Sequence, residues 1–171
     1  MSISYQIALG FALAMDAFAV SISSGIVISK TKIRHATMIA LFFGIFQGVM
    51  PLIGWHTGGI VRRFLRDWNN IAAFLILTAL GIKIIYNAIY KKKEDKSFNP
   101  LDIRILTLLA IATSLDALAV GFSLSLLKIS IINHILIIGA ITFIMSFAGT
   151  YIGEIFGSLF EEKIEIFSGI V

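Results

Sequence analysis

The chain has 171 residues, of which 58% are hydrophobic and 14% are charged, and its formal net charge is +4. An ordinary soluble domain carries roughly 25% charged residues, and the mean hydropathy of this chain is +0.94. The composition therefore indicates an integral membrane protein. The net positive charge is explained by loops that orient the chain in the bilayer rather than by nucleic-acid binding. Cysteine is absent, which excludes disulfides and thiolate metal ligands.

Long apolar runs follow one another along the chain, each close to the roughly 20 residues that a helix needs to cross a bilayer core. They lie at 5–27, 37–61, 70–90, 105–127 and 134–158. Each is expected to be helical, because lipid offers backbone groups no other hydrogen-bond partner. The first run has an acid at its centre and no basic segment before it, so we interpret it as a retained helix rather than a cleaved signal peptide.

Lysine and arginine residues are distributed unevenly between the two sides of the predicted spans. Nine follow the first, third and fifth runs, five of them in the basic segment 91–104, and four lie on the opposite side. Cytoplasmic loops are enriched in these residues. The sequence therefore predicts an N-terminus outside the cytoplasm and a cytoplasmic loop at 91–104.

The chain contains an internal repeat. A shift of 100 places "MDAFAVSIS" on "LDALAVGFS", so that Asp16 coincides with Asp116, and a shift of 99 places the second run on the fifth. Three helices per copy is an odd number, so the second copy enters the membrane from the opposite side. We expect an all-α membrane protein built from two inverted repeats of three spans, residues 1–90 and 105–171.

The second repeat lacks room for a full counterpart of the third run. That counterpart is expected to begin near Lys163, and "IEIFSGIV" at 164–171 is interpreted as the opening of a sixth helix. The sixth helix is therefore expected to be truncated or incomplete in this chain.

Asp16 and Asp116 lie near the midpoints of two spans that run in opposite directions, so both are expected at the same depth. An Asp at a helix centre costs about 2.5–3.5 kcal/mol on insertion scales, and acids inside a membrane usually mark a functional site. A structural ion pair with Lys83 is the alternative, but one lysine cannot neutralise two acids. The two carboxylates are expected to be protonated or to hold a cation, because desolvation and mutual repulsion both disfavour the charged pair.

A divalent cation matches the two negative charges and expels protons when it binds, because deprotonated oxygens are the better ligands. Metal ions and protons then compete for one site, which predicts an exchanger. Further oxygen ligands are expected from polar residues at suitable depths and helix faces. The complete set of predicted metal ligands is Asp16, Asp116, Thr113, Gln47, Ser23, Ser123 and Ser146.

At these residues the sequence resembles the MntP-type manganese efflux pumps, bacterial inner-membrane proteins related to the lysine-exporter superfamily. The resemblance covers "MDAFAVSI" at 15–22, "PLIGW" at 51–55, "LGIKII" at 80–85 and "IATSLDALAVG" at 111–121. It implies six helices, export of manganese(II) as the transported substrate, no cofactor, and ion-binding roles for Asp16 and Asp116. Family members vary at the position of Gln47 and often have an acid or another polar group there.

Two other functions are compatible with paired membrane acids. An exporter of another cation, such as a different divalent metal or a cationic amino acid, is one, although the Ala-rich surroundings of both acids favour a small ion. An intramembrane aspartyl protease is the other, but its G-x-G-D pattern is absent, because Asp16 follows "LAM" and Asp116 follows "TSL". We therefore expect a transporter rather than an enzyme, with a divalent ion, protons and the bilayer as its partners.

Overall fold

The computed structural model describes residues 3–28, 32–64 and 99–168, with only the backbone described at 61–64 and 159–168. Every regular element in these ranges is a helix. The helices are α1 (Ile3–Val27), α2 (Ile33–Phe64), α4 (Ile103–Thr113), α5 (Leu115–Leu126) and α6 (Ile132–Ser168). The expected span at 70–90, including Lys83, and most of the basic loop at 91–104 lie outside the described residues.

Three of these helices are long and apolar enough to cross a membrane, and α4 and α5 form a fourth candidate span as a bent pair. Their bounds agree to within a few residues with the runs expected at 5–27, 37–61, 105–127 and 134–158. The all-helical, multi-pass membrane class predicted from composition is confirmed for the described part of the chain.

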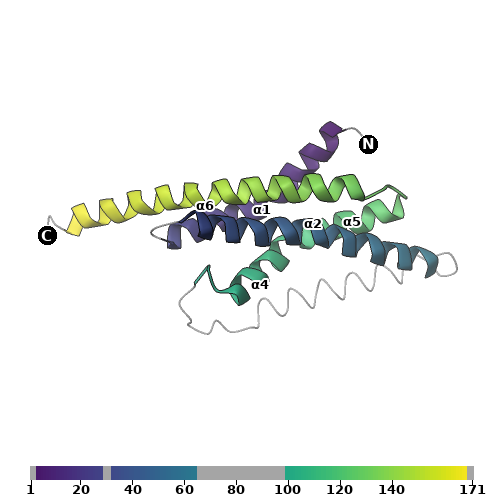
Figure 1. Cartoon of the computed structure of the whole chain (residues 1–171), viewed down its shortest axis with the longest axis horizontal. Helices are drawn as coiled ribbons and strands as arrows, with labels where there is room; N and C mark the ends of the chain where they lie inside the picture. Colours follow the sequence, from purple (N-terminus) through teal and green to yellow (C-terminus); the bar gives the residue numbers. More distant parts are fainter. Residues whose placement is uncertain (1–2, 29–31, 65–98, 169–171) are drawn as a thin grey trace.

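Helix α6 differs from the expectation. It runs without interruption from Ile132 to Ser168, so no separate helix begins at residue 164 in the described range. At 1.5 Å per residue, its 37 residues extend about 55 Å, well beyond a bilayer core of about 30 Å. Figure 1 shows its C-terminal part projecting past the other described helices.

The helices pack as two pairs. Helix α1 lies along α6, and α5 lies along α2, while α2 and α6 cross the centre of the bundle side by side in opposite directions (Figure 1). Consequently, α1 and α6 begin at one end of the bundle, and α2 and α4 begin at the other end.

Glycines set the distance between the paired helices. A Cβ atom added to Gly54 would meet the backbone carbonyl of Leu118, and one added to Gly121 would meet that of Pro51. The α1–α6 pair is built alike, with Gly153 against the carbonyl of Ile22. Small residues are the usual means by which membrane helices bring their backbones together.

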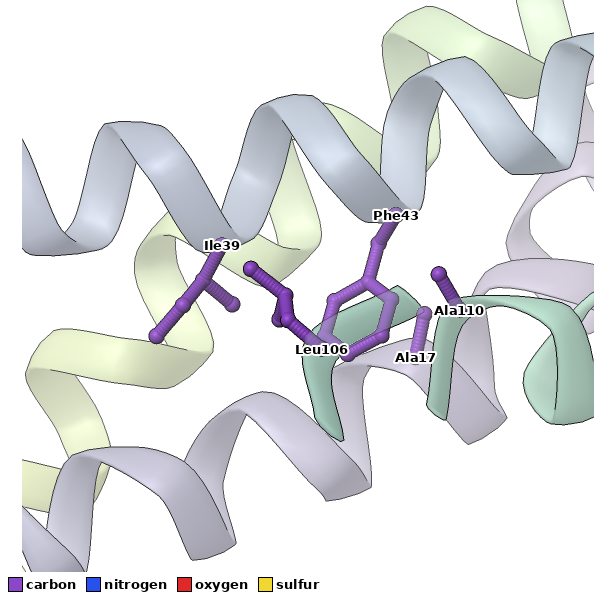
Figure 2. Close-up of a cluster of buried hydrophobic side chains, with 5 residues drawn as sticks. All are labelled: Ala17, Ile39, Phe43, Leu106 and Ala110. Atoms are coloured by element: carbon purple, nitrogen blue, oxygen red, sulfur yellow. The ribbon is translucent and has the colours of Figure 1, made fainter. Parts of the chain in front are cut away.

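Two groups of buried apolar side chains lie along the bundle, one on each side of the level of Asp16 and Asp116. The large cluster, toward the start of α2 and α4, consists of Ala17, Ile39, Phe43, Leu106 and Ala110 (Figure 2). The small cluster, toward the start of α1 and α6, consists of Leu13, Ala117 and Ile138. Three helices contribute to each cluster, so both hold the bundle together.

The close approach of the helices predicts which glycines tolerate a methyl group. Gly121→Ala and Gly153→Ala each force backbone against backbone, and overpacking of this kind costs about 1–3 kcal/mol. Thermal unfolding in detergent should show a lower midpoint for both variants. Gly48→Ala is the matched control, because the nearest atom to its added Cβ would be Cγ2 of Ile135 at 3.5 Å. An unchanged midpoint for Gly121→Ala would contradict the packing described here.

Candidate metal-ion site

The two acids occupy different local environments. Asp16 lies in the middle of the continuous helix α1 and is exposed, whereas Asp116 lies in the first turn of α5 and is half-buried. The two carboxyl groups are close enough for the charge of Asp16 to act on Asp116. The structure therefore brings together two residues that are one hundred positions apart in the sequence.

Gln47 connects the acids to helix α2. Its side chain is fully buried, and its Nε2 donates a 2.8 Å hydrogen bond to the carbonyl oxygen of Leu13, about one turn before Asp16. The same side chain also interacts with the carboxyl group of Asp116. Its Oε1 has no hydrogen-bond partner among the described residues. A neutral oxygen without a partner thus belongs to the side chain that interacts with Asp116.

The span that carries Asp116 is broken directly before the acid. Helices α4 and α5 meet at Ser114 with a bend of 42°. The Ser114 hydroxyl donates to the Ala110 carbonyl at 2.6 Å, which is the acceptor that its own backbone N–H would use in a continuous helix. That N–H instead reaches the carbonyl of Ile111 at 3.3 Å. Competition of this kind between a serine hydroxyl and the backbone is a known cause of helix bending.

The break gives Asp116 a favourable electrostatic position. The first N–H groups of a helix lack intrahelical acceptors and carry partial positive charge. One of them, the N–H of Ala117, donates to Oδ1 of Asp116 at 2.6 Å. The N-terminal end of α5 therefore partly compensates the negative charge of the Asp116 carboxylate.

The remaining predicted ligands are placed less uniformly. Thr113 is buried beside the break, and its hydroxyl donates weakly to the carbonyl of Ala110 at 3.3 Å. Ser23 and Ser123 are exposed and donate to the carbonyls of Ala19 and Ala119, respectively. The hydroxyl of Ser146 is buried and has no partner among the described residues.

Oxygen atoms dominate this arrangement. The described ranges contain no group of three or more His, Cys, Asp or Glu side chains that could hold a metal ion. The site instead offers two carboxylates, an amide oxygen and nearby hydroxyls. Carboxylate, carbonyl and water oxygens suit magnesium, calcium and manganese rather than softer ions.

Sequence reasoning missed three features of this region. The break at Ser114 was not predicted, although the "TS" pair before Asp116 was a possible signal. His134 was not among the predicted ligands, yet its ring is buried. Thr142 was not considered, but it lies one helical turn from Ser146 and is also fully buried.

A bundle of membrane-spanning helices with facing carboxylates beside a broken span is typical of secondary transporters. Comparison with known proteins agrees with this class. The family described as "Putative manganese efflux pump" matches residues 30–171, and the chain belongs to that family. The family is one of transporters rather than enzymes. No solved structure matches the chain.

Proteins named "Putative manganese efflux pump MntP" are similar over most of their length. The protein of Crocosphaera subtropica is 54% identical over 162 residues, which cover 95% of this chain and 86% of that protein. The protein of Methanosarcina acetivorans is 45% identical over the whole chain and 91% of its own length. That of Clostridium perfringens is 40% identical over the whole chain and 90% of its own length.

The position of Gln47 predicts that its amide oxygen contributes to cation binding. Gln47→Leu removes this oxygen and the bond to Leu13, and divalent-ion affinity should fall about 10-fold or more, corresponding to about 1.4 kcal/mol. Gln47→Glu supplies a charged oxygen at the same place and should bind at least as tightly as the natural chain. Calorimetric titration of the purified protein with manganese(II) measures both. Equal affinities for Gln47→Leu and the natural chain would remove Gln47 from the site.

Proposed function

We propose that this protein exports manganese(II) from the cytoplasm in exchange for protons, and that Asp16 and Asp116 hold the ion near the middle of the membrane. The observation that carries the proposal is the meeting of both acids with Gln47 at the broken span. The large and small clusters lie on opposite sides of this meeting point. Such an arrangement suits a site that opens to one side of the membrane at a time.

The packing of the helices supports an inverted repeat. The repeat shift pairs Gly54 with Gly153, and each of these glycines approaches the backbone of an acid-bearing span. Gly54 meets Leu118 of α5, and Gly153 meets Ile22 of α1, one helical turn from the repeat mate of Leu118. The α2–α5 pair therefore corresponds to the α6–α1 pair. The two clusters correspond in the same way, because Ala17 and Ile39 of the large cluster are repeat mates of Ala117 and Ile138 of the small cluster.

The count of basic residues along the chain supports an N-terminus outside the cytoplasm. Lys32, Arg34 and Arg104 lie at the end of the bundle where α2 and α4 begin, and Arg62, Arg63 and Lys128 lie at the opposite end, so these residues balance. The lysines of the segment 91–104 shift the count in favour of the first end. Under the positive-inside rule the first end is cytoplasmic. In a bacterial cell this orientation places the multi-pass chain in the inner membrane, with export directed toward the start of α1 and α6.

The chemistry of the donors supports manganese(II) as cargo. Both carboxylates and the amide oxygen of Gln47 are hard ligands that this ion shares with magnesium and calcium. The names of the relatives favour manganese among the three. A cationic amino acid is less favoured, because Ala17 and Ala117, which directly follow the two acids, are fully buried in packed clusters.

Exchange with protons follows from the charge of the site. Two negatively charged carboxylates held close together repel each other, and protons neutralise them when no metal ion is bound. An arriving divalent ion displaces the protons, because only deprotonated oxygens bind it well. After the ion leaves, protons from the release side neutralise the acids and allow the site to return. Two protons for one divalent ion leave the net charge of the site unchanged.

Loss of either acid should abolish transport. Asp16→Asn and Asp116→Asn each remove one negative charge without changing side-chain size, and manganese flux into proteoliposomes should fall by more than about 100-fold, since a lost first ligand should exceed the 10–100-fold typical of an outer partner. Asp102→Asn is the matched control, because Asp102 caps α4 by accepting from the N–H of Arg104, away from the acids. Normal manganese flux in both site variants would show that the ion binds elsewhere.

Proton exchange predicts that a pH gradient drives the metal. Proteoliposomes with a lumen one pH unit more acidic than the bath should accumulate manganese up to about 100-fold at two protons per ion. An ionophore that collapses the gradient should abolish the accumulation. If uptake is the same with and without the gradient, the protein is a uniporter and the exchange mechanism is wrong.

A further inference from the structure

One face of α6 carries a row of buried side chains at four-residue spacing. The row consists of His134, Ile138, Thr142, Ser146 and Thr150. Each is at most 2% exposed, and residues four apart lie one above the other on a helix. The row therefore runs from the start of α6 inward along a single buried stripe.

Most polar atoms of this row have no partner. Both ring nitrogens of His134 and the hydroxyls of Thr142 and Ser146 make no hydrogen bond within the described ranges. Thr150 differs, because its hydroxyl donates to the carbonyl of Ser146 at 2.8 Å. The unpaired groups thus occupy the stretch from Ser146 toward the start of α6. A buried polar group without a partner is costly, above all in a membrane, and such groups call for a functional explanation.

The two repeats differ in polarity at two buried positions. The repeat mate of Thr142 is the apolar Phe43, and the mate of Gln6 is the apolar Leu106. His134 and Ser146, in contrast, have the polar mates His35 and Gln47. Phe43 and Leu106 fill the large cluster and point toward each other between α2 and α4 (Figure 2). Gln6 and Thr142 are instead buried polar residues at the other end of the bundle. At these two positions the halves of the bundle therefore differ in polarity, with Phe43 and Leu106 at one end and Thr142 and Gln6 at the other.

A single large side chain of α6 interrupts the row. Ile138 belongs to the small cluster, where it packs with Leu13 and Ala117, and Leu9, Met50 and Val120 lie against them. Among the described residues, the small cluster closes the side toward the start of α6 with three buried residues. The large cluster closes the opposite side with five.

We propose that this face of α6 lines the route by which the hydrated cation leaves the acid pair. In this route, the hydroxyls of Ser146 and Thr142 contact the ion and its water as it moves outward, and Ile138 is the gate between them and His134. The inference rests on the proposed function, because it assumes that the acids hold a cation. It adds lining residues and a direction, namely release toward the start of α6.

The absence of cysteine allows a direct test. Thr142→Cys and Thr150→Cys each introduce the chain's sole thiol, two turns apart on one face of one helix. Both are made in the whole reconstituted chain, and a membrane-impermeant, positively charged thiol reagent is applied to each side of the membrane in turn. The thiol at 142 should react at least about tenfold faster than the thiol at 150, since reactivity follows access, and only from the side where α1 and α6 begin.

Equal rates at the two positions, or faster reaction of 142 from the opposite side, would overturn the route. Size-exclusion profiles identify any variant that fails to fold, in which case Ser146→Cys replaces Thr142→Cys against the same control. The result is separable from the proposed function. Normal flux in the Asp16→Asn and Asp116→Asn variants would defeat the metal site without changing the labelling, whereas failed labelling with inactive Asp variants would defeat the route alone.

The gate has its own test. Ile138→Ala shortens the side chain between the polar groups, so the thiol at 142 should react several-fold faster in the Ile138→Ala background. Ile39→Ala, the repeat mate in the large cluster, is the matched control and should leave the reaction from the α6 side unchanged. An unchanged rate with Ile138→Ala would remove Ile138 from the gate.

Discussion

Two carboxylates lie close together in this protein, and the rest of the structure depends on how their charge is compensated. The charge of Asp16 acts on Asp116, and two negative groups held near each other repel unless a positive group compensates them. The described structure supplies partial compensation from the end of α5 and from the amide of Gln47. In the proposed function a cation or protons complete this compensation. Binding, release and coupling to protons would then follow from a single electrostatic requirement.

The glycine contacts give this requirement its geometry. Because Gly153 brings α6 against α1, and Gly54 and Gly121 bring α2 and α5 together, the two acid-bearing spans are held by partners from the opposite repeat. Each repeat therefore positions the acid of the other. Gln47 reinforces this exchange, since it extends from α2 to the backbone of α1 at Leu13.

The helical class and the membrane spans of the described residues could be predicted because hydropathy is a property of the sequence itself. The break at Ser114 could not be predicted. It arises because the hydroxyl of Ser114, rather than its backbone N–H, donates to the carbonyl of Ala110, and the sequence does not decide between these two donors of one residue. The unpaired state of His134 and Thr142 is visible only when the neighbouring helices are in place. Span ends were the weakest predictions, because α6 continues past residue 158 without any change of element.

The interruption at Ser114 makes the two acid-bearing spans mechanically unequal. In α1 the backbone hydrogen bonds continue without a break, so Asp16 lies on a rigid helix. In the span formed by α4 and α5, the backbone N–H of Ser114 does not bond to the carbonyl of Ala110. Tilting α5 relative to α4 therefore breaks few backbone hydrogen bonds at this point. Asp116 thus lies directly after a break between two helices, whereas Asp16 lies within a continuous helix. A rotation at Ser114 would change the distance between the two carboxylates, and in the proposed function this change would strengthen or weaken their binding of the ion.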